Sequence, residues 1–232
     1  MNKTPTIITV LALALAGCNQ KFSWQGGAWQ PINVKATVVD SGSEQILKVE
    51  RDLKALPFDT ARLAATVDQP TYVKWLAHDV SAGVIEVKVF SRIKPDSPFK
   101  QARGFIGLVF YIGEDDKAFE SVYLRPSNGR STDSAMRSHA VQYFAYPDHK
   151  FDRLRREAPG IYESGADIGL NEWISLRLEI TKYARRLYIN EGKIPVLSVM
   201  EPRGTQSYGA IGLWVDIGTE GYFKEFRFIP AK

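Results

Sequence analysis

The side chains that could do chemistry gather in one stretch of the chain, residues 119–162. Two strand-like runs within it, 119–124 and 139–146, carry histidine, glutamine and tyrosine, with Arg125 and Arg137 beside them, and a loop with the turn signal Asn128-Gly129 joins the runs. Guanidinium and amide groups bind hydroxyl and carboxylate oxygens, while aromatic rings stack on sugar rings. Because strand pairing needs none of these side chains, the stretch predicts a sugar-binding surface. The candidate ligand-binding residues are Tyr123, Arg125, Arg137, His139, Gln142, Tyr143, Arg155 and Tyr162.

Catalysis is an alternative use of the same stretch. Glu157 and Glu163 are the candidate general acid and base, with His139 as another proton carrier. Arg125 and Arg137 would then hold an oxygen or neutralise developing charge. A structural histidine is the commoner role for a residue such as His139.

A structural use of these residues predicts different contacts. Arg125 would pair with Glu157 or Glu163 and so fix the loop over the sheet. Tyr143 and Tyr162 would then lie in the core. Both uses can hold at once, because a fixed loop can also cover a binding site.

The charges of the stretch indicate the kind of sugar. Six arginines lie between residues 125 and 156, against the acids Asp133, Asp148 and Asp152. This excess of cationic groups favours an acidic or oxidised sugar.

Alternating apolar and polar residues predict that strands position these side chains. The expected strands cover residues 28–33, 34–39, 45–51, 72–76, 84–90, 104–112, 119–124, 139–146, 172–181, 185–190, 195–199, 208–215 and 222–229. The one convincing helix covers residues 151–157 and ends before Pro159-Gly160. Residues 59–65 fit one helical turn or an irregular loop, and Trp173 and Trp214 are expected in the core. So many strands with so little helix predict an all-β antiparallel sandwich or barrel.

Several segments of the chain resemble a known family. They are 83–87, 104–110, 119–126, 141–143, 172–173 and 209–214, with the sequences GVIEV, GFIGLVF, FESVYLRP, VQY, EW and GAIGLW. Across residues 29–229 the chain resembles bacterial concanavalin A-like (laminin G-like) jelly-roll domains, whose neighbours are the domains named 3-keto-disaccharide hydrolase. The resemblance implies a jelly-roll β-sandwich of the lectin and glucanase type in an exported protein that handles carbohydrate. The same fold hosts lectins, hydrolases and lyases alike.

The carboxylates give little sign of catalysis. A glucanase on this fold usually carries E-x-D-x-x-E, which puts two carboxylates on one strand face, and the sequence has no such motif. Turn acids such as Asp216 and Glu220 are expected to be solvated. No metal or cofactor is predicted, because His78, His139 and His149 are too scattered for a zinc site. A calcium site of loop carboxylates and carbonyls stays open, although no twelve-residue calcium loop occurs.

The beginning of the chain resembles a bacterial lipoprotein signal. Lys3 precedes an apolar run at 7–15 that is too short to span a bilayer, and Leu15-Ala16-Gly17-Cys18 is a lipobox. The resemblance implies cleavage before Cys18 and lipidation of that residue, with 19–27 as a tether. Asn19 resembles the pattern that sorts lipoproteins to the outer membrane, if the source has one.

Composition limits the partners. Cys18 is the only cysteine, so neither an intramolecular disulfide nor a cysteine zinc site is possible. The 30 basic and 26 acidic residues leave a net charge of +4, or +3 without Lys3. This small excess, in a protein expected to be exported, argues against a nucleic-acid partner. The Cys18 lipid is the one predicted contact with a membrane.

The sequence therefore predicts one lipid-anchored jelly-roll domain, residues 28–232, that binds carbohydrate on a concave sheet and its lid, residues 123–163. The first alternative is a glycoside hydrolase or lyase acting on (keto-)disaccharides. The second is a structural envelope protein whose loop is only a packing device. Buried and mutually paired side chains of Arg125, His139 and Gln142 would indicate structure, and an open cleft would indicate a ligand.

Overall fold

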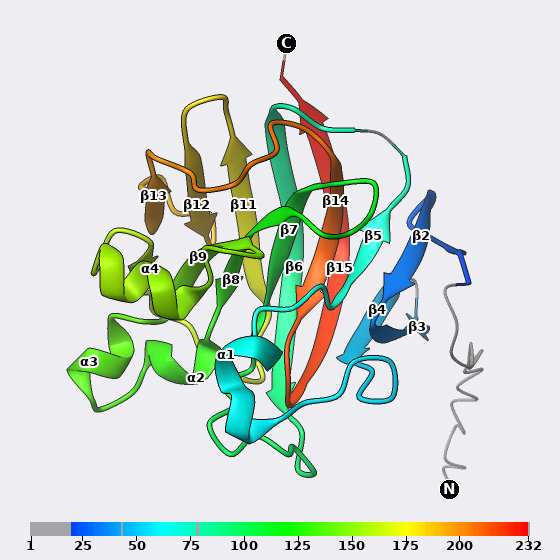
Figure 1. Ribbon diagram of the computed structural model, residues 1–232. Coiled ribbons are helices and arrows are strands. Elements are labelled where there is room, and N and C mark those ends of the chain that lie inside the picture. Colours follow the sequence, from blue (N-terminus) through cyan, green and yellow to red (C-terminus); the bar gives the residue numbers. More distant parts are fainter. Residues whose placement is uncertain (1–19, 43, 78, 232) are drawn as a thin grey trace, which may run out of the picture.

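The chain folds into two antiparallel β-sheets packed face to face (Figure 1). The computed structural model describes residues 20–42, 44–77 and 79–231. The predicted leader, Cys18 and Asn19 lie outside the described residues. The antiparallel pairing of every strand in two sheets confirms the predicted all-β sandwich.

The first sheet, here called sheet A, carries the predicted binding stretch. Its order is β1-β2-β5-β14-β7-β8-β9-β10. Its strands are β1 (Phe22–Trp24), β2 (Gly27–Ile32), β5 (Tyr72–Trp75), β14 (Ala210–Val215), β7 (Ile106–Ile112), β8 (Phe119–Leu124), β9 (Val141–Tyr146) and β10 (Glu163–Ser164). All residues of β7 and β8 are buried, so both faces of this sheet are covered at its centre.

The second sheet, sheet B, has one face in the core and the other toward solvent. Its order is β13-β12-β11-β6-β15-β4-β3. Its strands are β13 (Leu197–Val199), β12 (Arg185–Ile189), β11 (Ile174–Ile180), β6 (Gly83–Ile93), β15 (Thr219–Pro230), β4 (Glu44–Arg51) and β3 (Val34–Ser41). Alternating burial along β6 and β11 shows the single covered face.

Short helices occupy the loops at one end of sheet A (Figure 1). A 3-10 turn (Thr60–Arg62) leads into α1 (Leu63–Thr66), which confirms the helical turn considered for residues 59–65. Two single turns, α2 (Pro126–Gly129) and α3 (Ser134–Arg137), follow β8. The predicted helix at residues 151–157 is confirmed as α4 (Phe151–Glu157). No helix among the described residues is long and apolar enough to cross a membrane.

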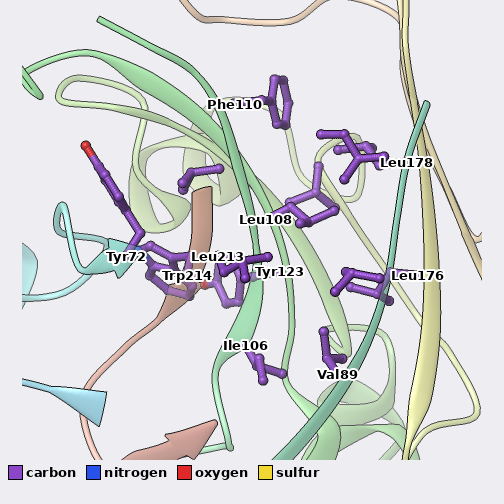
Figure 2. Close-up of a cluster of buried hydrophobic side chains, with 14 of the residues drawn as sticks. Tyr72, Val89, Ile106, Leu108, Phe110, Tyr123, Leu176, Leu178, Leu213 and Trp214 are labelled. Carbon is purple, nitrogen blue, oxygen red and sulfur yellow. The ribbon is translucent and has the colours of Figure 1, made fainter. Parts of the chain in front are cut away.

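The core between the sheets consists of aliphatic and aromatic side chains. Figure 2 shows Leu108 and Phe110 of sheet A pointing toward Leu176 and Leu178 of sheet B, and all four are fully buried or nearly so. Successive residues of a strand point to opposite faces, so Tyr123 lies on the outer face of sheet A. Its ring centroid is 4.9 Å from that of Trp214.

Two expectations about the N-terminal half and the core were wrong. The predicted tether, residues 19–27, is shorter, because β1 pairs with β2. Trp24 fixes β1 to the rest of the sheet. It is 1% exposed, packs edge-on against Trp29 and donates its indole N–H to the Gln45 carbonyl. Trp173 is not in the core but is 36% exposed on sheet B, whereas Trp214 is buried as predicted.

Candidate functional site

A pocket opens on the outer face of sheet A, where β8 ends. Its volume is about 210 Å³. The walls come from the loop around α1, the 99–105 loop, the 125–139 loop and α4. The lining residues used below are Asp68, Phe99, Arg103, Phe105, Tyr123, Arg125, His139, Phe151, Arg155 and Asp216.

Arg125 lies at the wall of this pocket and is fixed by neutral groups. Its Nη2 donates to the Tyr123 hydroxyl at 2.6 Å, and its Nη1 donates to Gln142 Oε1 and to the His139 carbonyl, both at 3.3 Å. The guanidinium carbon lies 5.0 Å from the ring centroid of Tyr123 and 5.2 Å from that of Phe151. Tyr123 and Gln142 are opposite each other on β8 and β9, so side chains from two neighbouring strands hold the guanidinium in place.

The hydrogen bonds of Arg125 leave part of its guanidinium unused. A guanidinium has five N–H donors, and three are accounted for. The Nε–H and one N–H of Nη2 have no acceptor among the described residues, and no carboxylate of the described chain forms an ion pair with Arg125. Its side chain is nevertheless buried, with the residue 5% exposed. A buried cation with free donors beside a pocket is a natural partner for a ligand oxygen.

Asp68 supplies a carboxyl group to the same pocket. It follows α1 in a left-handed backbone conformation with φ of 50°, and it is 2% exposed. Its Oδ2 accepts from the Phe151 backbone N–H at 2.9 Å, while Oδ1 receives no hydrogen bond from the described residues. Burial, reinforced by the nearby charge of Asp216, raises the pKa of Asp68 to about 7. The side chain is therefore poised to gain or lose a proton near neutral pH.

Asp216 supports the pocket but is itself fully bonded. Its Oδ1 accepts from Arg51 Nη1 at 2.8 Å and from the Ile217 N–H at 2.7 Å, and its Oδ2 accepts from the Asp68 N–H at 2.9 Å. The expectation that Asp216 is solvated was wrong. Asp216 is buried, and the buried side chain of Arg51 is its counter-ion. The other turn acid, Glu220, is partly buried and pairs with Lys48 at 2.7 Å.

Glu163, Arg155 and His139 form a second polar group beside Arg125. Arg155 makes a two-pronged ion pair with Glu163, with distances of 2.6 to 3.1 Å. His139 Nδ1 is 2.8 Å from Glu163 Oε2, although its ring direction is not that of a hydrogen bond. Glu163 is thus held by Arg155, and the predicted pairing of Arg125 with Glu157 or Glu163 is wrong.

Two predicted site residues lie away from the pocket. Arg137 is exposed and donates to the carbonyls of Ser131 and Thr132, where it closes the turn before α3. Glu157 is half exposed and pairs with Arg153 one helical turn earlier, at 2.8 Å. Helix periodicity directs both partners of this pair to solvent.

Tyr143 and Tyr162 lie on the opposite side of sheet A from Arg125. Neighbouring residues Gln142 and Tyr143 point to opposite faces, so they cannot line one site. The Tyr143 hydroxyl donates to Glu120 Oε2 at 3.0 Å, and its ring stacks on Tyr162 with centroids 5.5 Å apart. Both tyrosines are buried, as the structural alternative predicts.

The pocket gathers more positive than negative charge. Arg103 donates only to the Ala102 carbonyl, and Lys150 donates only to the carbonyls of Ala64 and Val67. Together with Arg125, they are three cations that form no ion pair with any described acid, although Lys150 lies beside the pocket and not in its lining. Of the two acids in the lining, Asp68 has no such pair, whereas Asp216 is matched by Arg51.

Of the predicted ligand-binding residues, the pocket brings together Tyr123, Arg125, His139 and Arg155, and Gln142 supports Arg125 from beneath. Sequence reasoning missed Asp68, Arg103 and Phe151. Asp68 and Arg103 lie in irregular loops, where alternation gives no direction for a side chain. Among the described residues, no group of three or more histidine, cysteine, aspartate or glutamate side chains could hold a metal ion.

This architecture is a two-sheet antiparallel sandwich of the galectin-like and concanavalin A-like class, and solved structures place the chain within that class. It is similar to the carbohydrate-binding module CBM66 from Bacillus subtilis, with a TM-score of 0.51 and 14% identity over 87% of this chain and 94% of that one. A putative glycosyl hydrolase from Parabacteroides distasonis matches with a TM-score of 0.47 and 10% identity over 88% of each chain. Domain 4 of AbnA, an extracellular arabinanase from Geobacillus stearothermophilus in complex with arabinotriose, matches with a TM-score of 0.41 and 12% identity over 85% of this chain and 76% of that one.

No family model and no curated protein matches the sequence. The similarity to CBM66 confirms the predicted fold class. The kinship with 3-keto-disaccharide hydrolase domains stays a prediction.

Proposed function

We propose that the protein binds carbohydrate in the pocket beside Arg125. The observation that carries this proposal is the buried guanidinium with two N–H donors that no described protein group accepts. A sugar hydroxyl or carboxylate oxygen would satisfy them. The aromatic rings of Phe99, Phe105 and Phe151 in the lining offer apolar faces for a sugar ring.

The ligand is one sugar unit, and an acidic one is favoured. The cavity of about 210 Å³ is smaller than the roughly 300–1,000 Å³ of typical ligand pockets, which suits a single ring at the end of a chain. In the lining, the two unpaired cations Arg103 and Arg125 against the one unpaired acid Asp68 favour a uronic or otherwise oxidised sugar. The similarity to a module whose name describes carbohydrate binding supports the class of ligand.

A second candidate function is hydrolysis or elimination at a glycosidic bond, including bonds of keto-disaccharides. The observation that favours it is Asp68, a carboxyl with a pKa of about 7 in a pocket, because proton transfer works best near such a value. Of the residues predicted for catalysis, Glu157 is not near the pocket and Glu163 is fully engaged by Arg155. His139 lines the pocket and remains available as a second proton carrier.

The structural alternative explains part of the same contacts. Gln142 is fully buried, and its amide is used by Arg125, the Tyr143 carbonyl and the Tyr162 carbonyl. His139, by contrast, keeps 27% of its side chain exposed. Gln142 therefore has a structural role beneath the pocket. The two unused N–H donors of Arg125 are the observation that favours a ligand in the pocket.

The test is calorimetric titration of the purified protein with neutral, uronic and 3-keto oligosaccharides, with product analysis of each mixture. Arg125→Gln is compared with Arg137→Gln, which changes an arginine outside the pocket. We expect at least one uronic ligand to bind, Arg125→Gln to lose at least tenfold in affinity, and Arg137→Gln to match the wild type. Equal affinity of Arg125→Gln and Arg137→Gln contradicts the proposal. So does a wild type that binds none of the oligosaccharides. Released sugar assigns the second function.

We also propose that the protein is exported and anchored by a lipid on Cys18, in the outer membrane if the source has one. The support is the lipobox Leu15-Ala16-Gly17-Cys18 with Asn19 after it. Labelling of expressing cells with a radioactive fatty acid tests this. Label in the wild type and none in Cys18→Ser is expected, whereas equal label in both contradicts it.

A further inference from the structure

Asp68 and Arg125 both present unused hydrogen-bonding groups to the same pocket. They come from different parts of the chain, the loop after α1 and the end of β8, and both line the pocket. Arg125 offers two free N–H donors, and Asp68 offers the free oxygen Oδ1. Since Asp68 Oδ2 is held by the Phe151 N–H and Phe151 also covers the guanidinium, the two groups are fixed relative to the same residue.

Charged groups surround Asp68 from several elements, and Arg103 of the 99–105 loop lines the pocket with it. From the turn after β14, Asp216 adds negative charge, which Arg51 of β4 neutralises. From β8 and the start of α4, Arg125 and Lys150 add positive charge. On the far wall of the pocket, His139 and Arg155 both lie against Glu163.

We propose that Asp68 takes up a proton when an acidic sugar binds, so that it donates a hydrogen bond to the ligand carboxylate that Arg125 holds. This inference rests on the proposed function, and it names the ligand as a carboxylate-bearing sugar and Asp68 as the specificity residue. The proton comes from solvent and is placed on Oδ1, and no covalent bond of the ligand forms or breaks. An ionised Asp68 would instead repel the incoming carboxylate.

The electrostatics of the unliganded pocket support this coupling. Burial has already raised the pKa of Asp68 to about 7, so one proton is only half lost at neutral pH. A second carboxylate nearby raises that pKa further, as in pairs of carboxyl groups that share one proton. A neutral sugar acts in the opposite direction, because its hydroxyl donates to the ionised carboxylate and stabilises that form.

The number of protons taken up on binding tests the proposal. Glucuronate and galacturonate oligosaccharides are titrated calorimetrically at pH 8 in phosphate and in Tris, whose ionisation enthalpies differ. We expect uptake of about one proton per ligand, and an affinity that falls by up to about tenfold per pH unit from pH 7 to 9. Asp68→Asn, which is permanently neutral, is expected to take up no proton and to keep at pH 8 the affinity of the wild type at pH 6. Asp115→Asn, which changes an exposed turn acid, should behave as the wild type.

The possible failures can be told apart. If no uronic or neutral oligosaccharide binds the wild type, the proposed function itself is overturned. If a ligand binds without proton uptake and Asp68→Asn leaves the pH dependence unchanged, only the role of Asp68 is overturned. Proton release on binding, with a preference for neutral sugars, also overturns it. Should Asp68→Asn not fold, the proton count of the wild type decides alone.

Discussion

Glu120 of β8 and Arg185 of β12 form a two-pronged ion pair inside the sandwich, with both N···O distances at 2.9 Å. The side chains are 1% and 4% exposed, so the pair links sheet A to sheet B away from water. Tyr143 adds a third hydrogen bond to Glu120, and its hydroxyl accepts from the Arg203 backbone N–H at 2.8 Å. The predicted site residue Tyr143 thus belongs to a structural network.

Removing Arg185 should be strongly destabilising. Arg185→Met leaves the Glu120 carboxylate buried without its counter-ion, and breaking such a pair costs about 3–5 kcal/mol in the free energy of unfolding. Urea denaturation followed by tryptophan fluorescence measures this loss. The double variant Glu120→Leu with Arg185→Met should regain most of the stability, because no buried charge remains. Equal losses in the single and double variants would contradict this account.

Gly107 is needed for the contact beneath the pocket. It lies opposite Tyr123 on β8 and opposite Trp214 on β14, whose rings meet over it. A Cβ at this position would lie 2.5 Å from Tyr123 Cα and would also contact the Val122 carbonyl oxygen. Gly107→Ala should therefore cost about 1–3 kcal/mol as an overpacked site and displace Tyr123.

The measurement for Gly107→Ala is urea denaturation together with ligand affinity. Gly160→Ala is a less suitable control because its φ of 77° is strained for alanine. Gly113→Ala is the matched control, since its nearest neighbours would be 3.7 Å from the added carbon. An unchanged stability of Gly107→Ala would contradict the close packing of the sheet.

The sequence predicted the strands well, because apolar and polar residues alternate along a strand that has one buried face. The expected runs at residues 84–90 and 172–181 correspond to β6 and β11, whose burial alternates residue by residue. The short edge strand β1 was missed because three residues give too little alternation to recognise. Trp173 was misplaced because it is in phase with Ser175 and Arg177, on the solvent face of sheet B, where its ring packs against Phe90.

The site could be predicted only where it lies on strands. Period two places Tyr123 and Arg125 on the same side, and that part of the prediction holds. The same period separates Gln142 from Tyr143, so those two could not both face one ligand. Asp68 owes its position to loop packing against Asp216, 148 residues away in sequence, and no local pattern records such a contact.

Two ion pairs on α4 should differ in their contribution to stability. Arg155 holds Glu163, whose side chain is 5% exposed, whereas Arg153 holds Glu157, whose side chain is 50% exposed. Arg155→Gln should cost about 2–4 kcal/mol because it strands a buried carboxylate. Arg153→Gln, the matched change on the same helix, should change the free energy of unfolding little, because solvent screens the exposed pair. Chemical denaturation of both variants checks this, and similar costs would mean that Glu163 does not depend on Arg155.

Asp68→Asn should stabilise the protein, and increasingly so as the pH rises from 4 to 7. The folded pKa of Asp68, about 7, lies above its ordinary value of 3.8, so within this window the folded state binds a proton that the unfolded state has lost. The wild type therefore loses stability as the pH rises to 7, and above pH 7 both states are ionised and the loss is complete. The shift from 3.8 to about 7, at about 1.4 kcal/mol per pKa unit, makes the advantage of the variant at pH 8 on the order of 4 kcal/mol. Asparagine keeps an oxygen for the Phe151 N–H and tolerates the left-handed backbone.

Denaturation at pH 5, 6, 7 and 8 measures the difference in stability between Asp68→Asn and the wild type. Asp115→Asn is the control and should show no such gain. Asp115 is exposed, and a backbone hydrogen bond from Lys117 lowers its pKa. A pH-independent difference between Asp68→Asn and the wild type would show that Asp68 is already ionised throughout this range.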